Sequence, residues 1–212
     1  PPAVASHPAG GTVVSGGDTS FVVEVTGTGP FTYKWQRDGV DIDGATAPTL
    51  TLTDVSSVDD ALYTVLVENP YGLTVSDPAK LEVTLPVSIT GQPADTHVVL
   101  DGTLALSVTA TGTGPFEYQW YRGDEKIEGA VEADMQLPNM TRLKDGLYRV
   151  KVKNLLGAMF SREAAVVVDE PVTITVQPGG ATLLQGEDAV MWALATGSEP
   201  LSYQWQKDGV AL

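Results

Sequence analysis

Apolar and polar residues alternate in short runs along this chain. In residues 21–25 and again in residues 63–67, every second position carries a large apolar side chain. A period of two places these side chains on one face of a β-strand. Leu50 and Leu52, set among threonines, repeat the pattern, as do Leu81 and Val83. No stretch shows the period of a helix, so the pattern predicts strands with one buried face.

Turn signals separate the predicted strands. Glycine, proline and aspartate mark these turns, because they tolerate the backbone dihedrals that tight turns need. Many short strands at this spacing predict an all-β chain built of antiparallel β-sandwiches. The turn signals are Gly16-Gly17, 27–30, Asp38-Gly39, Asp43-Gly44 and 70–72.

A repeat of 85 residues organises the chain. Three of the four tryptophans, Trp35, Trp120 and Trp205, are evenly spaced at that interval. Each ends one phrase: TGTGPFTYKW at 26–35, TGTGPFEYQW at 111–120 and TGSEPLSYQW at 196–205. The three phrases align without a gap. Such self-similarity is the signature of tandem modules.

The repeat predicts three domains. The first covers residues 1–85, the second 86–170, and the third, 171–212, supplies about half a repeat. That half would carry the first three strands and leave Val190, Leu194 and Trp205 without opposite partners. We expect the chain to continue beyond residue 212. The alternative is self-association, in which another molecule supplies the missing strands.

Four positions of the first repeat resemble immunoglobulin-like domains of the intermediate (I-set) type. In that family a core cysteine precedes a tryptophan by about a dozen residues, and a tyrosine stands two residues before a second cysteine. Val23, Trp35, Tyr63 and Val65 occupy these places here. Their counterparts in the second repeat are Val108, Trp120, Tyr148 and Val150. The resemblance implies tandem immunoglobulin-like sandwiches, and a trailing Asn-x-x-Gly at 69–72 and 154–157 supports it.

The chain departs from this family in having no cysteine. The valine pairs must therefore replace the core disulfide by apolar packing, worth roughly 1.5 to 3 kcal/mol per buried side chain. Cysteine-free modules with this phrase also resemble those of large bacterial surface or secreted proteins. Lys144 stands where the first repeat has Asp59, so an ion pair at that place is not expected in the second repeat. Pro138 is expected to break the fifth strand there or to place it at a sheet edge.

The net charge of the chain restricts the classes of partner that it can bind. Asp and Glu number 27 against 12 Lys and Arg, giving a net charge of -15. Such a surface repels phosphate backbones and anionic lipids, so no nucleic-acid partner is expected. No apolar run reaches the roughly 20 residues that span a bilayer, so no membrane insertion is expected in this segment.

No catalytic, cofactor or metal site is predicted, and the segment is not expected to be an enzyme. Asp38, Asp41 and Asp43 lack the spacing of a calcium loop and fit a hairpin turn. Asp169 and Glu170 could bind calcium beside the linker, although Thr84 and Leu85 occupy the equivalent positions and are not acidic. The two histidines, His7 and His97, fall in different repeats without partners at metal-ligand spacing.

The remaining possibility is a surface that recognises a partner. Arg149, Lys151 and Lys153 share the outward face of one strand, where cross-strand ion pairing with Glu117 is favoured over a free basic patch. Tyr71 and Tyr121 are the aromatic residues best placed for recognition. The loops at 27–30 and 70–72 are a further candidate surface.

These observations predict structural, spacer and interaction modules of a larger extracellular or cell-surface protein. Neighbouring modules of the same chain and a protein or glycan are the expected partners. Linkers at Pro86 and Pro171 favour a semi-rigid arrangement. The alternatives are glycan- or protein-binding accessory modules of a secreted enzyme and a cytoplasmic, titin-like elastic array.

Overall fold

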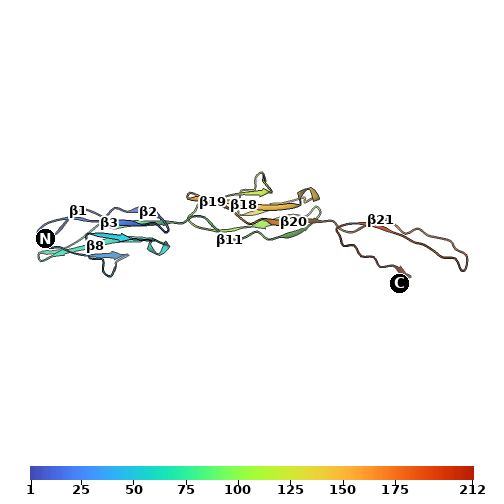
Figure 1. Ribbon diagram of the computed structural model, residues 1–212, viewed down its shortest axis with the longest axis horizontal. Helices are drawn as coiled ribbons and strands as arrows, with labels where there is room; N and C mark the ends of the chain where they lie inside the picture. The colour runs from blue at the N-terminus through green and yellow to red at the C-terminus, as the bar shows by residue number, and fades with distance from the viewer. The chain divides into compact units, whose positions relative to one another are not determined.

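The computed structural model describes residues 1–212 (Figure 1). Its secondary structure is β-strand, with two short 3-10 helices. The chain divides into two compact units. The first comprises residues 1–88, 111–116 and 153–158, and the second comprises 89–110, 117–152 and 159–212.

The first sandwich uses ten strands. One layer contains the pairs β1–β4 and β3–β7, and the other has the order β2-β10-β8-β5-β6, with β9 also paired to β8. Most pairs are antiparallel, but β2 runs parallel to β10. The strands are β1 (Ala3–Ser6), β2 (Gly11–Val14), β3 (Thr19–Val22), β4 (Glu24–Thr26), β5 (Thr32–Arg37), β6 (Val40–Asp41), β7 (Thr49–Leu52), β8 (Ala61–Asn69), β9 (Gly72–Val75) and β10 (Ala79–Thr84).

The second sandwich repeats this plan. The pairs β11–β14 and β13–β17 form one layer, and the other has the order β12-β20-β18-β15-β16, with β19 paired to β18. Again the pair β12–β20 is parallel. The strands are β11 (Ser88–Gly91), β12 (Thr96–Val99), β13 (Leu104–Ser107), β14 (Thr109–Thr111), β15 (Glu117–Arg122), β16 (Glu125–Lys126), β17 (Asp134–Leu137), β18 (Gly146–Asn154), β19 (Gly157–Phe160) and β20 (Ala164–Asp169).

The predicted core is confirmed in both sandwiches. Trp35 and Val65 are fully buried, and Val23 is 3% exposed. The Trp35 indole Nε1 donates a hydrogen bond to the Ala47 carbonyl at 2.9 Å, so its one polar atom is satisfied. Trp120 is equally buried and donates to the Glu132 carbonyl at 2.9 Å. Valine and tryptophan therefore fill the space that a disulfide occupies in the family.

A tyrosine corner fixes the entry to the long central strand of each sandwich. The Tyr63 hydroxyl donates to the Asp59 carbonyl at 3.0 Å, at the end of the 3-10 helix η1 (Ser57–Asp59). The Tyr148 hydroxyl donates to the Lys144 carbonyl at 2.7 Å, at the end of η2 (Arg142–Lys144). Both rings are buried, so these bonds lie against the core.

Pro138 lies just after an edge strand of the second sandwich, which is one of the two outcomes expected for it. Pro138 does not break a strand, because β17 ends at Leu137. The corresponding strand β7 ends at Leu52, which is the equivalent position one repeat earlier. Proline therefore follows the last residue that pairs, where its missing N–H removes no ladder bond. The edge placement is confirmed, since β13 is the only strand that pairs with β17.

Residues 171–212 form no closed core. The strands β21 (Thr173–Val176) and β22 (Leu194–Thr196) pair with each other, as do β23 (Gln206–Lys207) and β24 (Val210–Ala211). Trp205, equivalent to the buried Trp120, is 38% exposed, and Val190 and Leu194 are 89% and 52% exposed.

Candidate interaction surface

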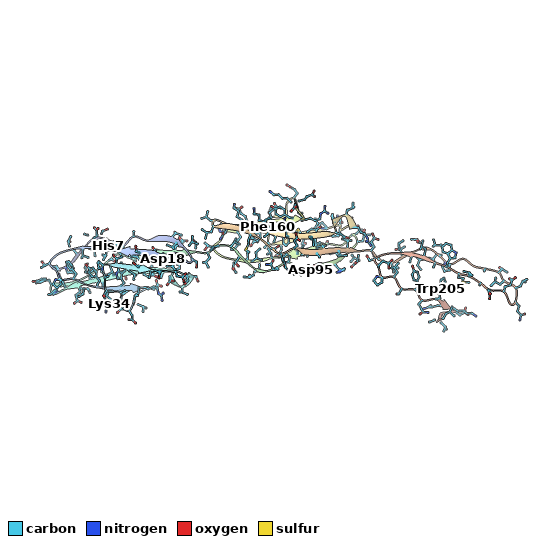
Figure 2. The ribbon with its side chains drawn as sticks, viewed as in Figure 1. His7, Asp18, Lys34, Asp95, Phe160 and Trp205 are labelled. Carbon is cyan, nitrogen blue, oxygen red and sulfur yellow. The ribbon has the colours of Figure 1, made fainter.

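The second sandwich carries an aromatic and cationic cluster on the outward face of β15, β18 and β19. The Arg149 guanidinium lies 4.6 Å from the centre of the Phe160 ring, and the Lys151 ammonium lies 5.7 Å from it. Tyr121 meets the same ring edge-on, with 5.6 Å between centroids. We call Tyr121, Arg149, Lys151 and Phe160 the Phe160 cluster. Figure 2 labels Phe160 on this sandwich.

Strand alternation explains why these side chains face outward. Tyr148, Val150 and Val152 are fully buried in β18, so Arg149 and Lys151 between them must point to the opposite face. The aromatic ring and the cations then pack on one another at the surface, an arrangement worth about 0.5 to 1 kcal/mol at exposed sites. Phe160 nevertheless remains 43% exposed. The cluster thus presents an apolar ring framed by positive charge.

Carboxylates hold the guanidinium in place. Arg149 Nη2 lies 2.8 Å from Asp124 Oδ1, and Nη1 lies 3.9 Å from Glu163 Oε1. Ion pairing is therefore found for Arg149, with Asp124 and Glu163. The expected pairing of Glu117 with this group of cations stays a prediction. Arg149 Nε is buried without a hydrogen-bond acceptor. An unsatisfied buried donor is costly, so it works against the stability that the ion pairs of Arg149 add.

The same face of the first sandwich carries different side chains. One repeat earlier, the residues equivalent to the Phe160 cluster are Gln36, Thr64, Leu66 and Val75, which include no aromatic ring and no cation. Val75 is 48% exposed. The cluster is therefore a property of the second sandwich and not of the shared frame.

One side chain, Asn69, links the two loops proposed for recognition. Asn69 Nδ2 donates to the Thr28 carbonyl at 2.7 Å, and Asn69 Oδ1 accepts from the Tyr71 N–H at 2.9 Å. This ties the loop at 70–72 to the loop at 27–30. Tyr71 is 67% exposed, as predicted, whereas Tyr121 is half-buried against Phe160. Sequence reasoning missed Phe160, the residue at the centre of the cluster.

The polar residues considered for metal binding have other partners. His7 Nδ1 accepts from the Asp77 N–H at 2.7 Å, and His97 Nδ1 lies 2.9 Å from Asp169 Oδ2. Glu170 pairs with the Arg142 guanidinium at 3.0 Å. Each of these groups therefore has a role on the surface of its own unit.

The aspartates at the hairpin between β5 and β6 act within the turn, as predicted. Asp38 and Gly39 both have positive φ, at 48° and 82°, which suits a two-residue hairpin turn. Asp38 Oδ1 accepts from the Leu62 N–H at 2.9 Å. A hydrogen bond from Gln36 and then the Lys34 ammonium hold the pKa of Asp41 below its ordinary value.

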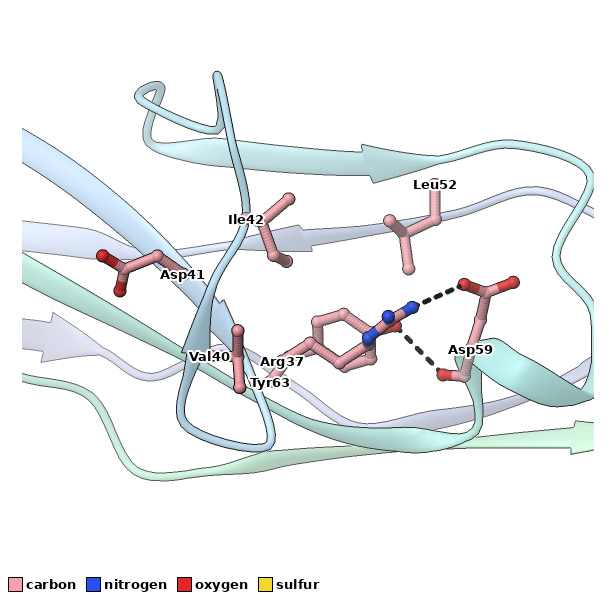
Figure 3. A pocket seen from close by; sticks show the side chains of 7 residues that line it. All are labelled: Arg37, Val40, Asp41, Ile42, Leu52, Asp59 and Tyr63. Atoms are coloured by element: carbon pink, nitrogen blue, oxygen red, sulfur yellow. Dashed lines mark hydrogen bonds and ion pairs between the residues drawn. The ribbon is translucent and has the colours of Figure 1, made fainter.

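A small hollow lies beside this hairpin (Figure 3). Arg37 Nη1 lies 3.3 Å from Asp59 Oδ1, and Figure 3 shows Arg37 and Tyr63 both reaching Asp59. Burial, and next the Asp59 carboxylate, raise the pKa of Tyr63. The phenol therefore stays protonated and keeps its hydrogen bond at neutral pH.

No helix of the chain is long and apolar enough to cross a membrane. No protein-family model matches the chain. Its similarity to the human cell adhesion molecule DSCAM is 24% identity over 208 residues, which covers 88% of the chain and 10% of DSCAM. The chain thus spans about a tenth of the length of that relative.

Solved structures agree with the fold. An I-band fragment of titin aligns over the whole chain and 81% of its own length, with a TM-score of 0.62 and 24% identity. DIP-gamma, in a complex with a Dpr protein, aligns over 79% of this chain and 98% of its own, with a TM-score of 0.65 and 17% identity. The expected resemblance to bacterial modules stays a prediction. Together with the buried tryptophans, the tyrosine corners and the absence of cysteine, these likenesses identify the chain as a disulfide-free tandem of immunoglobulin-like β-sandwiches.

Proposed function

We propose that this chain provides non-catalytic adhesion and spacer modules, and that the Phe160 cluster is the surface through which the second module contacts a protein partner. The observation that carries this proposal is the exposed ring of Phe160 under Arg149 and beside Tyr121. Tyrosine and arginine are enriched among the residues that dominate protein interfaces. The ordered ring and guanidinium would lose little conformational freedom on binding.

The relatives support a protein partner outside the cell. The human relative is described as a cell adhesion molecule, and DIP-gamma has been solved bound to another immunoglobulin-domain protein. We therefore propose that the chain belongs to an extracellular or cell-surface protein. We also propose the domain limits 1–85, 86–170 and 171–212, with Pro86 and Pro171 as stiff connections that favour a spacer role.

Binding of the whole chain to a panel of extracellular proteins and glycans, and to itself, tests this proposal. Surface plasmon resonance would compare the chain with the double variant Tyr121→Ala and Phe160→Ala. We expect the affinity for a positive partner to fall at least about tenfold, because truncating a central interface residue typically costs more than 1 kcal/mol.

A matched control uses the equivalent positions of the first sandwich, Gln36→Ala and Val75→Ala, which should leave the affinity unchanged. Equal weakening by both double variants would contradict the assignment of the contact to the second sandwich. A panel in which only glycans bind would contradict the protein partner.

A further inference from the structure

Both sandwiches contain the same hollow at the end of the central sheet. It measures about 200 Å³ in the first and about 180 Å³ in the second. Its apolar wall is identical, with Ile42 and Leu52 matched by Ile127 and Leu137 one repeat later. Its floor is the corner tyrosine, and an arginine closes one side, Arg37 in the first and Arg122 in the second.

The charged groups around this common frame are reversed. Asp41 and Asp59 line the first hollow, and Lys126 and Lys144 take their places in the second. Glu125 replaces Val40 as the only acid in the second lining. The second hollow therefore gathers three cations and one acid, in a chain whose net charge is -15.

These three cations lack the counter-charge that the first hollow supplies. Arg37 is neutralised by the carboxylate of Asp59 at 3.3 Å. In the second sandwich Arg122 Nη1 donates to the Leu143 carbonyl at 2.7 Å. The Lys144 ammonium donates to the carbonyls of Pro138 and Asn139, at 3.0 and 2.9 Å.

Arg122, Lys126 and Lys144 form no ion pair within the chain. Carbonyl groups satisfy hydrogen bonds but do not cancel charge. A concave site with uncompensated positive charge attracts an anion from outside.

We propose that the second hollow binds a carboxylate side chain from an acidic segment of a partner protein, in the place that Asp59 fills in the first sandwich. The first hollow shows that this frame accepts an Asp carboxylate against its arginine. The guanidinium fork matches a carboxylate in two hydrogen bonds, and the ammonium of Lys126 adds a second positive charge.

The surroundings favour the carboxylate of one side chain over a densely charged chain of phosphates or sulfates. Glu125 lines the hollow, and Asp124 and Asp145 flank its cations in sequence. These acids would repel a chain of phosphates or sulfates, but leave room for one side chain that enters between the cations. The hollow uses other residues than the Phe160 cluster, so the two proposals can fail separately.

The test titrates the ¹⁵N-labelled chain with hexaglutamate at low salt and follows the amide signals of Lys126, Ile127 and Lys144 by NMR. Hexaglutamine serves as the uncharged probe. We expect saturable shifts at these residues with hexaglutamate alone. Arg122→Gln and Lys126→Gln should each weaken the affinity about tenfold, since each removes one charge-assisted contact.

Lys144→Asp is the decisive variant, because it installs the acid that the first sandwich already tolerates at the same place. It should supply an internal partner for Arg122 and abolish hexaglutamate binding while the sandwich stays folded. The reciprocal pair, Asp41→Lys with Asp59→Lys, should create binding at the first hollow. Shifts that survive Lys144→Asp, or tighter binding of a sulfated glycan at the same residues, would overturn the proposal.

Discussion

The first and second sandwiches share a frame and differ in their surfaces. Trp35 and Trp120 are equally buried, and the two corner tyrosines donate to equivalent carbonyls. Three of the twelve Lys and Arg residues fall in the first repeat and eight in the second. The contacts that hold the fold are thus kept between repeats while the exposed charge changes. This separation gives the two sandwiches different surfaces on the same fold.

The strongest test of the shared frame is removal of its tryptophans. Trp35→Ala and Trp120→Ala should each destabilise their own sandwich by about 3 to 5 kcal/mol, because each leaves a large cavity. Trp205→Ala should change stability by about 0.5 kcal/mol or less, since that side chain is 38% exposed. Denaturant unfolding followed by amide signals of each sandwich would measure all three. A Trp205→Ala effect as large as the others would show a closed third core.

Cysteine pairs would sharpen the comparison of the two cores. Val23→Cys with Val65→Cys, and Val108→Cys with Val150→Cys, should oxidise to bridges in both sandwiches. Each bridge is expected to add about 2 to 4 kcal/mol, because it closes a long loop in the unfolded chain. Mass spectrometry of free thiols and thermal unfolding give the result. Thiols that stay free in one sandwich would show that its strand registers differ from its neighbour's.

The corner tyrosines should respond alike. Tyr63→Phe and Tyr148→Phe each remove one hydroxyl donor and leave a carbonyl without it, so each should cost about 1 kcal/mol. Equilibrium unfolding in urea is the measurement. A much smaller loss in the second sandwich would mean that the hydrogen bond from Arg122 to Leu143 already holds that corner.

The smallest expected difference between the two sandwiches is in how much stability each loses at acid pH. The Lys80 ammonium, and next the Val83 N–H, hold the pKa of Asp60 below its ordinary value of 3.8. The native state therefore binds fewer protons than the unfolded chain, so this stabilisation is present above that value and is lost as pH falls through the lower folded pKa.

The second sandwich has Ala165 at the place of Lys80, so it lacks the lysine part of this contribution, while the Val168 N–H still donates to Asp145 at 2.7 Å. Thermal unfolding between about pH 2 and 5 should show a steeper acid loss for the first sandwich, and Asp60→Asn should reduce the difference, leaving the part that Asp41 contributes. Unchanged slopes in that variant would contradict the assignment.

The parts of the molecule that follow from period two and from the 85-residue repeat could be predicted from the sequence. Trp35, Tyr63 and the valine pair are of this kind, because alternation alone decides which face is buried. Phe160 could not be found this way, since all four residues of β19 are exposed and show no alternation.

The neighbours of Arg149 could be predicted only with the strand register, which the sequence does not supply. In the first sandwich Gln36 lies opposite Thr64, which are the equivalents of Tyr121 and Arg149. By the same register Tyr121 is expected across from Arg149, and Glu117 across from Lys153, because Thr32 lies opposite Glu68. The charge reversal of the hollow could be predicted only in part. The replacement of Asp59 by Lys144 can be read from the repeat, but the fold is needed to show that Lys144 lines the same hollow as Arg122 and Lys126.

The parallel pairing of the second and last strands has a mechanical consequence. In the first sandwich β2 runs beside β10 from Leu81 with Gly11 to Thr84 with Val14, and β12 repeats the same register against β20. Tension along the polypeptide pulls the two strands of such a pair past each other. All of their hydrogen bonds are then loaded at once in shear and cannot open one by one. Each complete sandwich should therefore resist stretching far better than residues 171–212, where no such pair forms.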